Sequence, residues 1–146
     1  MKLQAQALLV CASVGIGPSA LADKPIQKKD TPAAVQRTID EQSKGVTVRG
    51  LFTETEGGKT HYELELTVSG HSKDLLIDPA GKIVSVEEEI PLASVPQAAR
   101  ATLEKRGTIL KVESVTKDGV VSYEAKVESA GKKSEVAVTA EGVVKK

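Results

Sequence analysis

The sequence of 146 residues fits one compact domain or two very small ones, and its 20 Lys plus Arg balance its 20 Asp plus Glu. A neutral chain lacks the excess of cations that binding to duplex nucleic acid requires, so no nucleic-acid partner is expected. Only 2% of the residues are aromatic, which argues against base-stacking surfaces and predicts a core of aliphatic side chains.

Residues 1–22 have the layout of a secretory signal peptide. Lys2 supplies a positive start, residues 5–17 are apolar and uncharged, and Ala20-Leu21-Ala22 has small residues at both cleavage positions. Cleavage is predicted after Ala22, which places the mature chain in the periplasm or outside the cell. No second apolar segment is long enough for a membrane span, so none is expected.

The cysteine of the chain, Cys11, lies inside the apolar stretch of this signal. Lipidation of Cys11 would require a small residue before it, and Val10 stands there instead. Lipidation stays an alternative to simple cleavage. If Cys11 is removed with the signal, the mature chain has no disulfide chemistry.

A first unit is predicted over residues 31–90, after a polar linker at residues 23–30. A helix is expected from Pro32 to Gly45, because proline suits a helix start and glycine suits a helix end. Val35 and Ile39 form its apolar stripe. Four strands with glycine turns between them are expected to follow. They begin at Val46, His61, Leu75 and Ile83.

A second unit is predicted over residues 91–146, where the same order of signals starts again. A helix is expected between Pro96 and Gly107, with Ala99 and Leu103 in the apolar stripe. Strands are expected at residues 109–116, 120–128 and 134–139, and a last one begins at Val143.

The two units form an internal repeat. Tyr62-Glu63 of the first unit recurs as Tyr123-Glu124 in the second. Three glycine pairs have the same separation along the chain: Gly58 and Gly119, Gly70 and Gly131, Gly81 and Gly142. A unit of about 60 residues is marginally stable alone, so two units gain by sharing a sheet or an interface. The predicted fold class is α+β, with two tandem helix-plus-antiparallel-sheet (αββββ) repeats.

The strand and turn motifs of the first unit resemble a PepSY domain. They are Tyr62-Glu63-Leu64-Glu65-Leu66, Asp78-Pro79-Ala80-Gly81 and Lys82-Ile83-Val84. The likeness is to the PepSY-like group that is related to secreted β-lactamase inhibitor proteins. Residues 123–144 are a second, similar copy that lacks the Asp-Pro turn. The resemblance implies a helix packed on an antiparallel sheet, export from the cytoplasm, and a role in binding or restraining other proteins.

Two polar constellations suggest metal sites. His61 and His71 fall on adjacent predicted strands with Glu63 nearby, but zinc normally requires three or four ligands, and solvated histidines are expected instead. The run Glu87-Glu88-Glu89 suggests binding of calcium or of a basic partner, but it lacks the ligand spacing of a calcium loop, and a solvated strand edge is expected instead. No metal-ligating residue is therefore assigned.

Paired carboxylates for acid–base chemistry are the remaining catalytic candidates. They are Glu54, Glu56, Glu63 and Glu65. Alternation places them on the solvent face of a hairpin, where no environment would separate their pKa values. The sequence also contains no Gly-x-Ser-x-Gly motif and no glycine-rich phosphate loop. We therefore assign no catalytic or cofactor-binding residue and expect no enzyme activity and no cofactor.

The predicted function is an exported, non-enzymatic protein-binding or inhibitor-like module of the cell envelope. Its partner would be another envelope or secreted protein. Tyr62 and Tyr123 are expected to pack the helices onto the sheet. The alternative is a periplasmic sensor of a small ligand or metal, with its site in a groove between the two units. An enzyme that depends on His61 is the third hypothesis.

Overall fold

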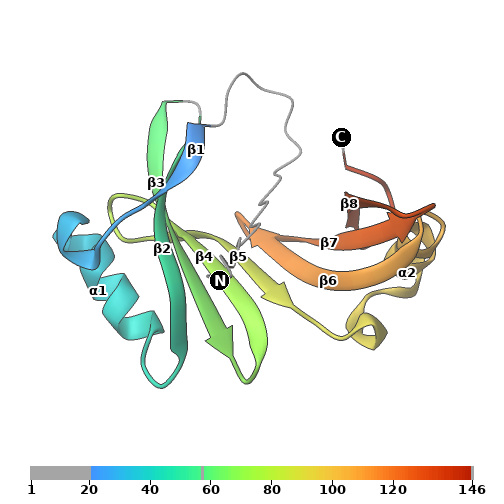
Figure 1. Ribbon diagram of the computed structural model, residues 1–146, viewed down its shortest axis with the longest axis horizontal. Helices are drawn as coiled ribbons and strands as arrows, with labels where there is room; N and C mark the ends of the chain where they lie inside the picture. Colours follow the sequence, from blue (N-terminus) through green and yellow to red (C-terminus); the bar gives the residue numbers. More distant parts are fainter. Residues whose placement is uncertain (1–20, 57, 146) are drawn as a thin grey trace, which may run out of the picture.

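The computed structural model describes residues 21–56 and 58–145 of the chain (Figure 1). The predicted signal peptide falls mostly on residues 1–20, and it lies outside the described residues together with Cys11. Leu21 and Ala22 belong to the first strand, β1 (Leu21–Pro25). Cleavage after Ala22 stays a prediction.

Within the described residues the strands form one antiparallel sheet in which each strand pairs with the next along the chain. The strands after β1 are β2 (Thr47–Glu56), β3 (Lys59–Val68), β4 (His71–Ile77), β5 (Ile83–Glu89), β6 (Thr108–Lys117), β7 (Val120–Ser129) and β8 (Lys132–Thr139). The helices are α1 (Ala33–Gln42) and α2 (Gln97–Glu104), each preceded by a 3-10 turn, η1 (Lys28–Asp30) or η2 (Leu92–Ser94). The predicted α+β class with two αββββ-like units is confirmed. The fourth strand of the second unit is reduced to a bridge between Val138 and Val144.

Each helix covers its own part of the sheet with the predicted apolar stripe. Val35 and Ile39 of α1 are buried in a cluster with residues of β3 and β4. Ala99 and Leu103 of α2 are buried in a second cluster with residues of β6, β7 and β8. These short helices depend on that burial, because helices of this length are marginal alone in water. The strand residues of the clusters are Tyr62, Leu64, Leu66, Leu75 and Ile77 in the first, and Val112, Ala125, Val127 and Val138 in the second.

The repeat is visible in how each helix meets a glycine turn. The Thr38 hydroxyl of α1 donates a hydrogen bond to the Gly81 carbonyl oxygen over 2.6 Å. In α2 the Thr102 hydroxyl donates to the Gly142 carbonyl oxygen over 2.8 Å. Both glycines have positive φ, and a Cβ at Gly81 would lie 2.6 Å from the Ala34 carbonyl oxygen. Glycine is required at these turns because the backbone has a positive φ and because the helix leaves no room for a Cβ atom.

The two tyrosines also occupy matching positions. Tyr62 pairs across the sheet with Thr53 and Ile77. Tyr123 pairs with Ser114 and Val138, which are the repeat equivalents of the two partners of Tyr62. Both rings contact the hydrophobic cluster of their unit, which fits the expected packing role.

Residues 23–30, expected as a linker, contain the end of β1 and the turn η1. The Ile26 amide donates to the Leu51 carbonyl oxygen over 3.0 Å, and the Ile26 side chain packs against the first cluster. The segment is therefore part of the sheet layer. The predicted bounds of the two units, residues 31–90 and 91–146, stay predictions.

Both helices lie on the same face of the sheet. Val86 of β5 packs against the first cluster and is directly opposite Thr116 of β6, so their side chains share a face. Thr116 and Val112 are four positions apart on β6, so their side chains also share a face. Val112 belongs to the second cluster, and the two clusters therefore lie on the same face of the sheet. Figure 1 shows α1 and α2 at opposite ends of the molecule, with the sheet bending between them. The other face, the helix-free face, lies inside this bend.

Candidate protein-binding surface

The helix-free face carries a row of carboxylates that crosses the sheet from β3 to β8. Asp74 is directly opposite Glu65 on one side and Glu87 on the other. Glu113 is directly opposite both Glu89 and Glu124. Side chains opposite each other share a face and have Cβ atoms about 5 Å apart. We call this row the acidic strip; its members are Glu63, Glu65, Asp74, Glu87, Glu89, Glu113, Glu124 and Glu135.

Part of the acidic strip is buried, and the prediction of a fully solvated face is therefore wrong. Glu63 and Glu65 are 7% and 5% exposed, although alternation placed them on a solvent face. One cause is Phe52 of β2, whose ring lies over Gly50. A Cβ at Gly50 would lie 2.4 Å from Phe52 Cε2 and 3.3 Å from Glu65 Oε2. An aromatic ring thus shields the carboxylate from water on a face without a helix.

The prediction that Glu87-Glu88-Glu89 is a solvated edge is also wrong. All three residues lie in β5, which pairs with β4 and β6 in the middle of the sheet. Glu87 and Glu89 belong to the acidic strip, and Glu88 points to the opposite face with Lys73 and Ser114. The sequence could not show this position, because it depends on the pairing of β5 with β6 of the other unit.

Cations contact the acidic strip at two places, from β2 and from β6. The Arg49 guanidinium forms an ion pair with Asp74, lies 3.7 Å from Glu65 Oε2, and donates to the Leu66 carbonyl oxygen over 3.1 Å. Lys111 Nζ lies 2.6 Å from Glu113 Oε1. Among the described residues, no ion pair reaches the carboxylates of Glu87 and Glu124. Glu87 and Glu124 are therefore central carboxylates of the strip without an ion-pair partner among the described residues, although Lys111 pairs with the neighbouring Glu113.

Burial and mutual repulsion raise the pKa values of the central carboxyls. Burial, followed by the charges of Glu124, Glu113, Asp74 and Glu63, raises the pKa of Glu87 to about 7. Burial also raises the pKa of Asp74 and outweighs the opposing charge of Arg49. The pKa of Glu124 is raised by burial and by the charges of Glu135 and Glu113, which together outweigh the opposing charge of Lys145. The strip therefore holds protons at a pH where isolated carboxylates hold none.

Glu89, in contrast, is held in its charged form. The Ser72 amide and hydroxyl donate to Glu89 Oε2 over 3.2 and 3.3 Å. The backbone hydrogen bond is the main cause that lowers the pKa of Glu89. The carboxyls of one strip thus occupy unequal environments, a feature that the sequence pattern did not indicate.

We expect Arg49→Gln to destabilise the fold by about 1–2 kcal/mol at pH 8, because Asp74 and Glu65 would be left buried without their cation. The side chains of Asp74 and Glu65 are 11% and 6% exposed. Urea unfolding would measure the change. Lys73→Gln is the control, since it removes only the partner of the exposed Glu88 and is expected to cost less than about 0.5 kcal/mol. Equal effects of the two changes would contradict a structural role for Arg49.

The two histidines do not meet, contrary to the approach considered from sequence. His61 is opposite Glu54 near the start of β3, whereas His71 is opposite Val68 near its end. At about 3.3 Å per residue the two lie roughly 20 Å apart along the hairpin. His71 Nδ1 instead lies 3.5 Å from Glu89 Oε1. In the described part of the chain no group of three His, Cys, Asp or Glu could hold a metal ion.

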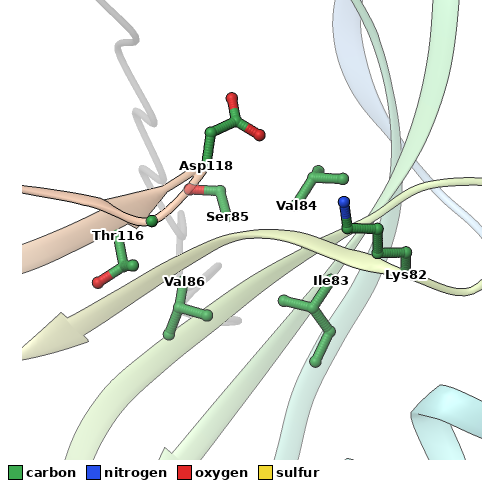
Figure 2. A pocket seen from close by; sticks show the side chains of 8 residues that line it. Lys82, Ile83, Val84, Ser85, Val86, Thr116 and Asp118 are labelled. Atoms are coloured by element: carbon green, nitrogen blue, oxygen red, sulfur yellow. The ribbon is translucent and has the colours of Figure 1, made fainter.

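The junction between the two units contains a shallow hollow, which is the place where a groove was considered. It is lined by residues 82–86 of the β4–β5 turn and β5, and by Thr116, Asp118 and Gly119. Figure 2 shows Ile83 and Val86 on one side of β5, and Val84 and Ser85 on the other. The lining side chains therefore straddle the strand and do not converge on one enclosed space.

The fold and this surface define a class: a two-layer α+β protein whose two helices cover one face of an antiparallel meander and leave the other face open. No family model matches the sequence, and no curated protein matches it. Among the described residues, no helix has the length and apolar character of a membrane span.

Solved structures share this architecture. One is a predicted periplasmic protein from Bacteroides eggerthii, with 17% identity and a TM-score of 0.61, covering 78% of this chain and 85% of that one. A DUF2874 family protein from Bacteroides ovatus has 16% identity and a TM-score of 0.60, covering 80% and 85%. A BLIP-like protein from Bacteroides fragilis has 16% identity and a TM-score of 0.55, covering 80% and 84%. The chain is similar in fold to DUF2874 and BLIP-like proteins.

Proposed function

We propose that this chain is an exported, non-enzymatic module of the cell envelope that binds another protein through the helix-free face. The observation that supports this proposal is the open face of the sheet. Both helices cover one face, and the opposite face presents partly buried polar groups. Antiparallel sheets of this kind offer a broad, rigid surface on which side chains keep fixed positions. The surface suits recognition of a protein partner better than enclosure of a small molecule.

Export and an inhibitor-like role belong to the same proposal. The predicted signal peptide and the periplasmic name of the Bacteroides eggerthii relative support a periplasmic or extracellular location. The BLIP-like name of the Bacteroides fragilis relative agrees with the resemblance of the sequence to the inhibitor-related PepSY-like group. The sensor alternative has less support, because the residues at the junction between the units do not converge on a pocket.

Site-directed cross-linking in the envelope would test the proposed function. The described residues contain no cysteine, so Lys126→Cys would place one exposed thiol on the helix-free face, where Lys126 is directly opposite Glu135. Glu41→Cys would place a matched thiol on α1, where Glu41 is exposed. After export and treatment with a maleimide cross-linker, we expect a defined protein adduct from Lys126→Cys that is absent from Glu41→Cys.

The adduct would be identified by mass spectrometry, and the purified partner would then be titrated with the unmodified protein. Saturable binding of that partner would support the proposal. Adducts of the same proteins at both positions, or no adduct at Lys126→Cys in any growth condition, would count against it.

A further inference from the structure

The acidic strip has an excess of negative charge at its centre. Arg49 contacts the strip from β2 and Lys111 contacts it from β6. Asp74 and Glu87 are directly opposite each other, and no cation within the described residues bridges them. Two carboxylates facing each other across a sheet are destabilising when both are charged. The isolated protein therefore carries a repulsion that an external cation would relieve.

Unsatisfied polar groups on the same face are a second, independent observation. His61 Nδ1 and Glu135 Oε2 are buried atoms without a hydrogen-bond partner among the described residues. Ser85 is 7% exposed, and its hydroxyl makes no hydrogen bond within that part of the chain. Cross-strand pairing puts Ser85 beside Leu76, on the face of Glu63 and Glu87. A buried hydroxyl is normally hydrogen-bonded, so Ser85, which lies on the same face as Glu87, is available to a polar group of a partner.

We infer that the helix-free face binds a cationic protein segment, whose arginine or lysine side chains enter the acidic strip between Asp74, Glu87 and Glu124. This inference rests on the proposed function and adds the chemistry of the partner. A guanidinium supplies five fixed donors to carboxylates and hydroxyls, and its weak hydration suits a partly buried site. A neutral or acidic segment would leave the carboxylates unpaired and desolvated, which disfavours it.

Protons compete with this cation for the same carboxylates. The carboxyl of Glu87 is accompanied on the helix-free face by acidic groups of the strands β3 to β8 and by fewer cations. The acidic groups are Glu63, Glu65, Asp74, Glu89, Glu113, Glu124 and Glu135. The cations that share this face are Arg49, Lys111, Lys117, Lys126, Lys133 and Lys145. Arrival of a cation expels a proton, so binding is weaker in acid.

Binding of an oligoarginine peptide to the protein purified from envelope extracts would test this inference. Fluorescence anisotropy would follow a labelled peptide at pH 8 and pH 6, with oligoglutamate of equal length as the negative probe. We expect saturable binding of oligoarginine alone, and affinity at least about fivefold lower at pH 6. Glu87→Gln combined with Glu124→Gln is expected to lower the affinity at pH 8 by about tenfold or more, since each change removes a charge-assisted contact.

Glu41→Gln is the matched control, because it removes one exposed carboxylate from the helix side and is expected to leave affinity unchanged. Circular dichroism would verify that every variant is folded. Equal loss in Glu41→Gln, or no loss in the double variant, would overturn the inference. So would complete displacement of the peptide by calcium ions at equal concentration, which would indicate a cation site of another kind.

The failure of this inference can be separated from failure of the proposed function. If oligoarginine does not bind but Lys126→Cys still cross-links a partner, the face binds protein and the cationic chemistry is wrong. If neither experiment succeeds, both the proposed function and the inference are wrong.

Discussion

Glu87→Gln is expected to stabilise the protein by about 2 kcal/mol at pH 8 and to have little effect near pH 4.5. The pKa of Glu87 is raised from 4.5 to about 7, mainly by burial and then by neighbouring carboxylates. A pKa difference of one unit between the folded and unfolded states changes the free energy of unfolding by about 1.4 kcal/mol. Partial contact of the Glu87 side chain with solvent makes the expected change smaller than the whole pKa difference would give. Glutamine keeps the shape of the side chain and removes the charge.

The sign of this effect follows from proton binding. The unfolded chain releases the Glu87 proton near pH 4.5, and the folded protein releases it near pH 7. Between these values the folded state holds more protons, so the free energy of unfolding falls as pH rises. The free energy of unfolding of the wild-type protein therefore decreases between pH 4.5 and 7, as Glu87 loses its proton. In Glu87→Gln this decrease does not occur, because glutamine has no proton to lose in this range. The difference between the two proteins should therefore be largest above pH 7.

Urea unfolding at pH 5 and pH 8 would measure the difference. Glu88→Gln is the control, because it changes the next residue of β5, whose side chain is 47% exposed and points to the opposite face. That variant is expected to change the free energy of unfolding by less than about 0.5 kcal/mol at either pH. A destabilised Glu87→Gln at pH 8 would show that the charged carboxylate is well accommodated and would contradict our description of the strip.

Gly81→Ala is expected to destabilise the protein by about 3 kcal/mol. Gly81 has a φ of +84°, and an added Cβ would lie 2.6 Å from the carbonyl oxygen of Ala34 in α1. The methyl group would force the turn away from α1 and would weaken the hydrogen bond that the Thr38 hydroxyl donates to Gly81. Strain of the backbone and steric overlap each contribute about 1–3 kcal/mol in such positions.

Gly70→Ala separates these two contributions. Gly70 has a similar φ of +86°, but nothing lies within 4 Å of the position of its Cβ. We expect this control to cost about 1 kcal/mol, which leaves about 2 kcal/mol of the Gly81 effect for the clash with α1. Gly142→Ala should resemble Gly81→Ala, since its Cβ would lie 2.5 Å from the Ala98 carbonyl oxygen. Equal melting temperatures for Gly81→Ala and Gly70→Ala would contradict the close approach of α1.

The two predictions describe opposite kinds of position. Gly81 serves the fold, because helix and turn approach there more closely than any side chain permits. Glu87 opposes the fold, because a charge is placed among other charges of the same sign. Residues that lower stability without an evident structural benefit are often found where a protein binds a partner. This contrast agrees with the proposal that the helix-free face binds a partner.

Local sequence patterns were sufficient to predict the helices and the repeat. Val35 with Ile39, and Ala99 with Leu103, are spaced by one helical turn and are buried as predicted. Tyr62 and Tyr123 stand at corresponding places in the two units and occupy matching positions in the sheet. Spacings of this kind depend on the geometry of single elements, which is fixed by the backbone.

Local sequence patterns did not predict the burial and the neighbours of the residues in the acidic strip. Alternation assigned Glu63 and Glu65 to the correct face but not to the correct environment, since Phe52 of another strand shields Glu65 from solvent. Glu87 and Glu89 were assigned to an edge, because no local pattern indicates that β5 pairs with β6 across the two units. The separation of His61 from His71 likewise depends on the register of β3 and β4.

The sequence by itself determined the helical stripes, the glycine turns, the duplication and the α+β class. Only the tertiary structure decided that the two units share one sheet, that both helices cover the same face, and that carboxylates from strands of both units meet on the other face. The physical reason is that a side chain's direction is set within its own strand, whereas its burial and its charged neighbours are set by strands distant in the chain.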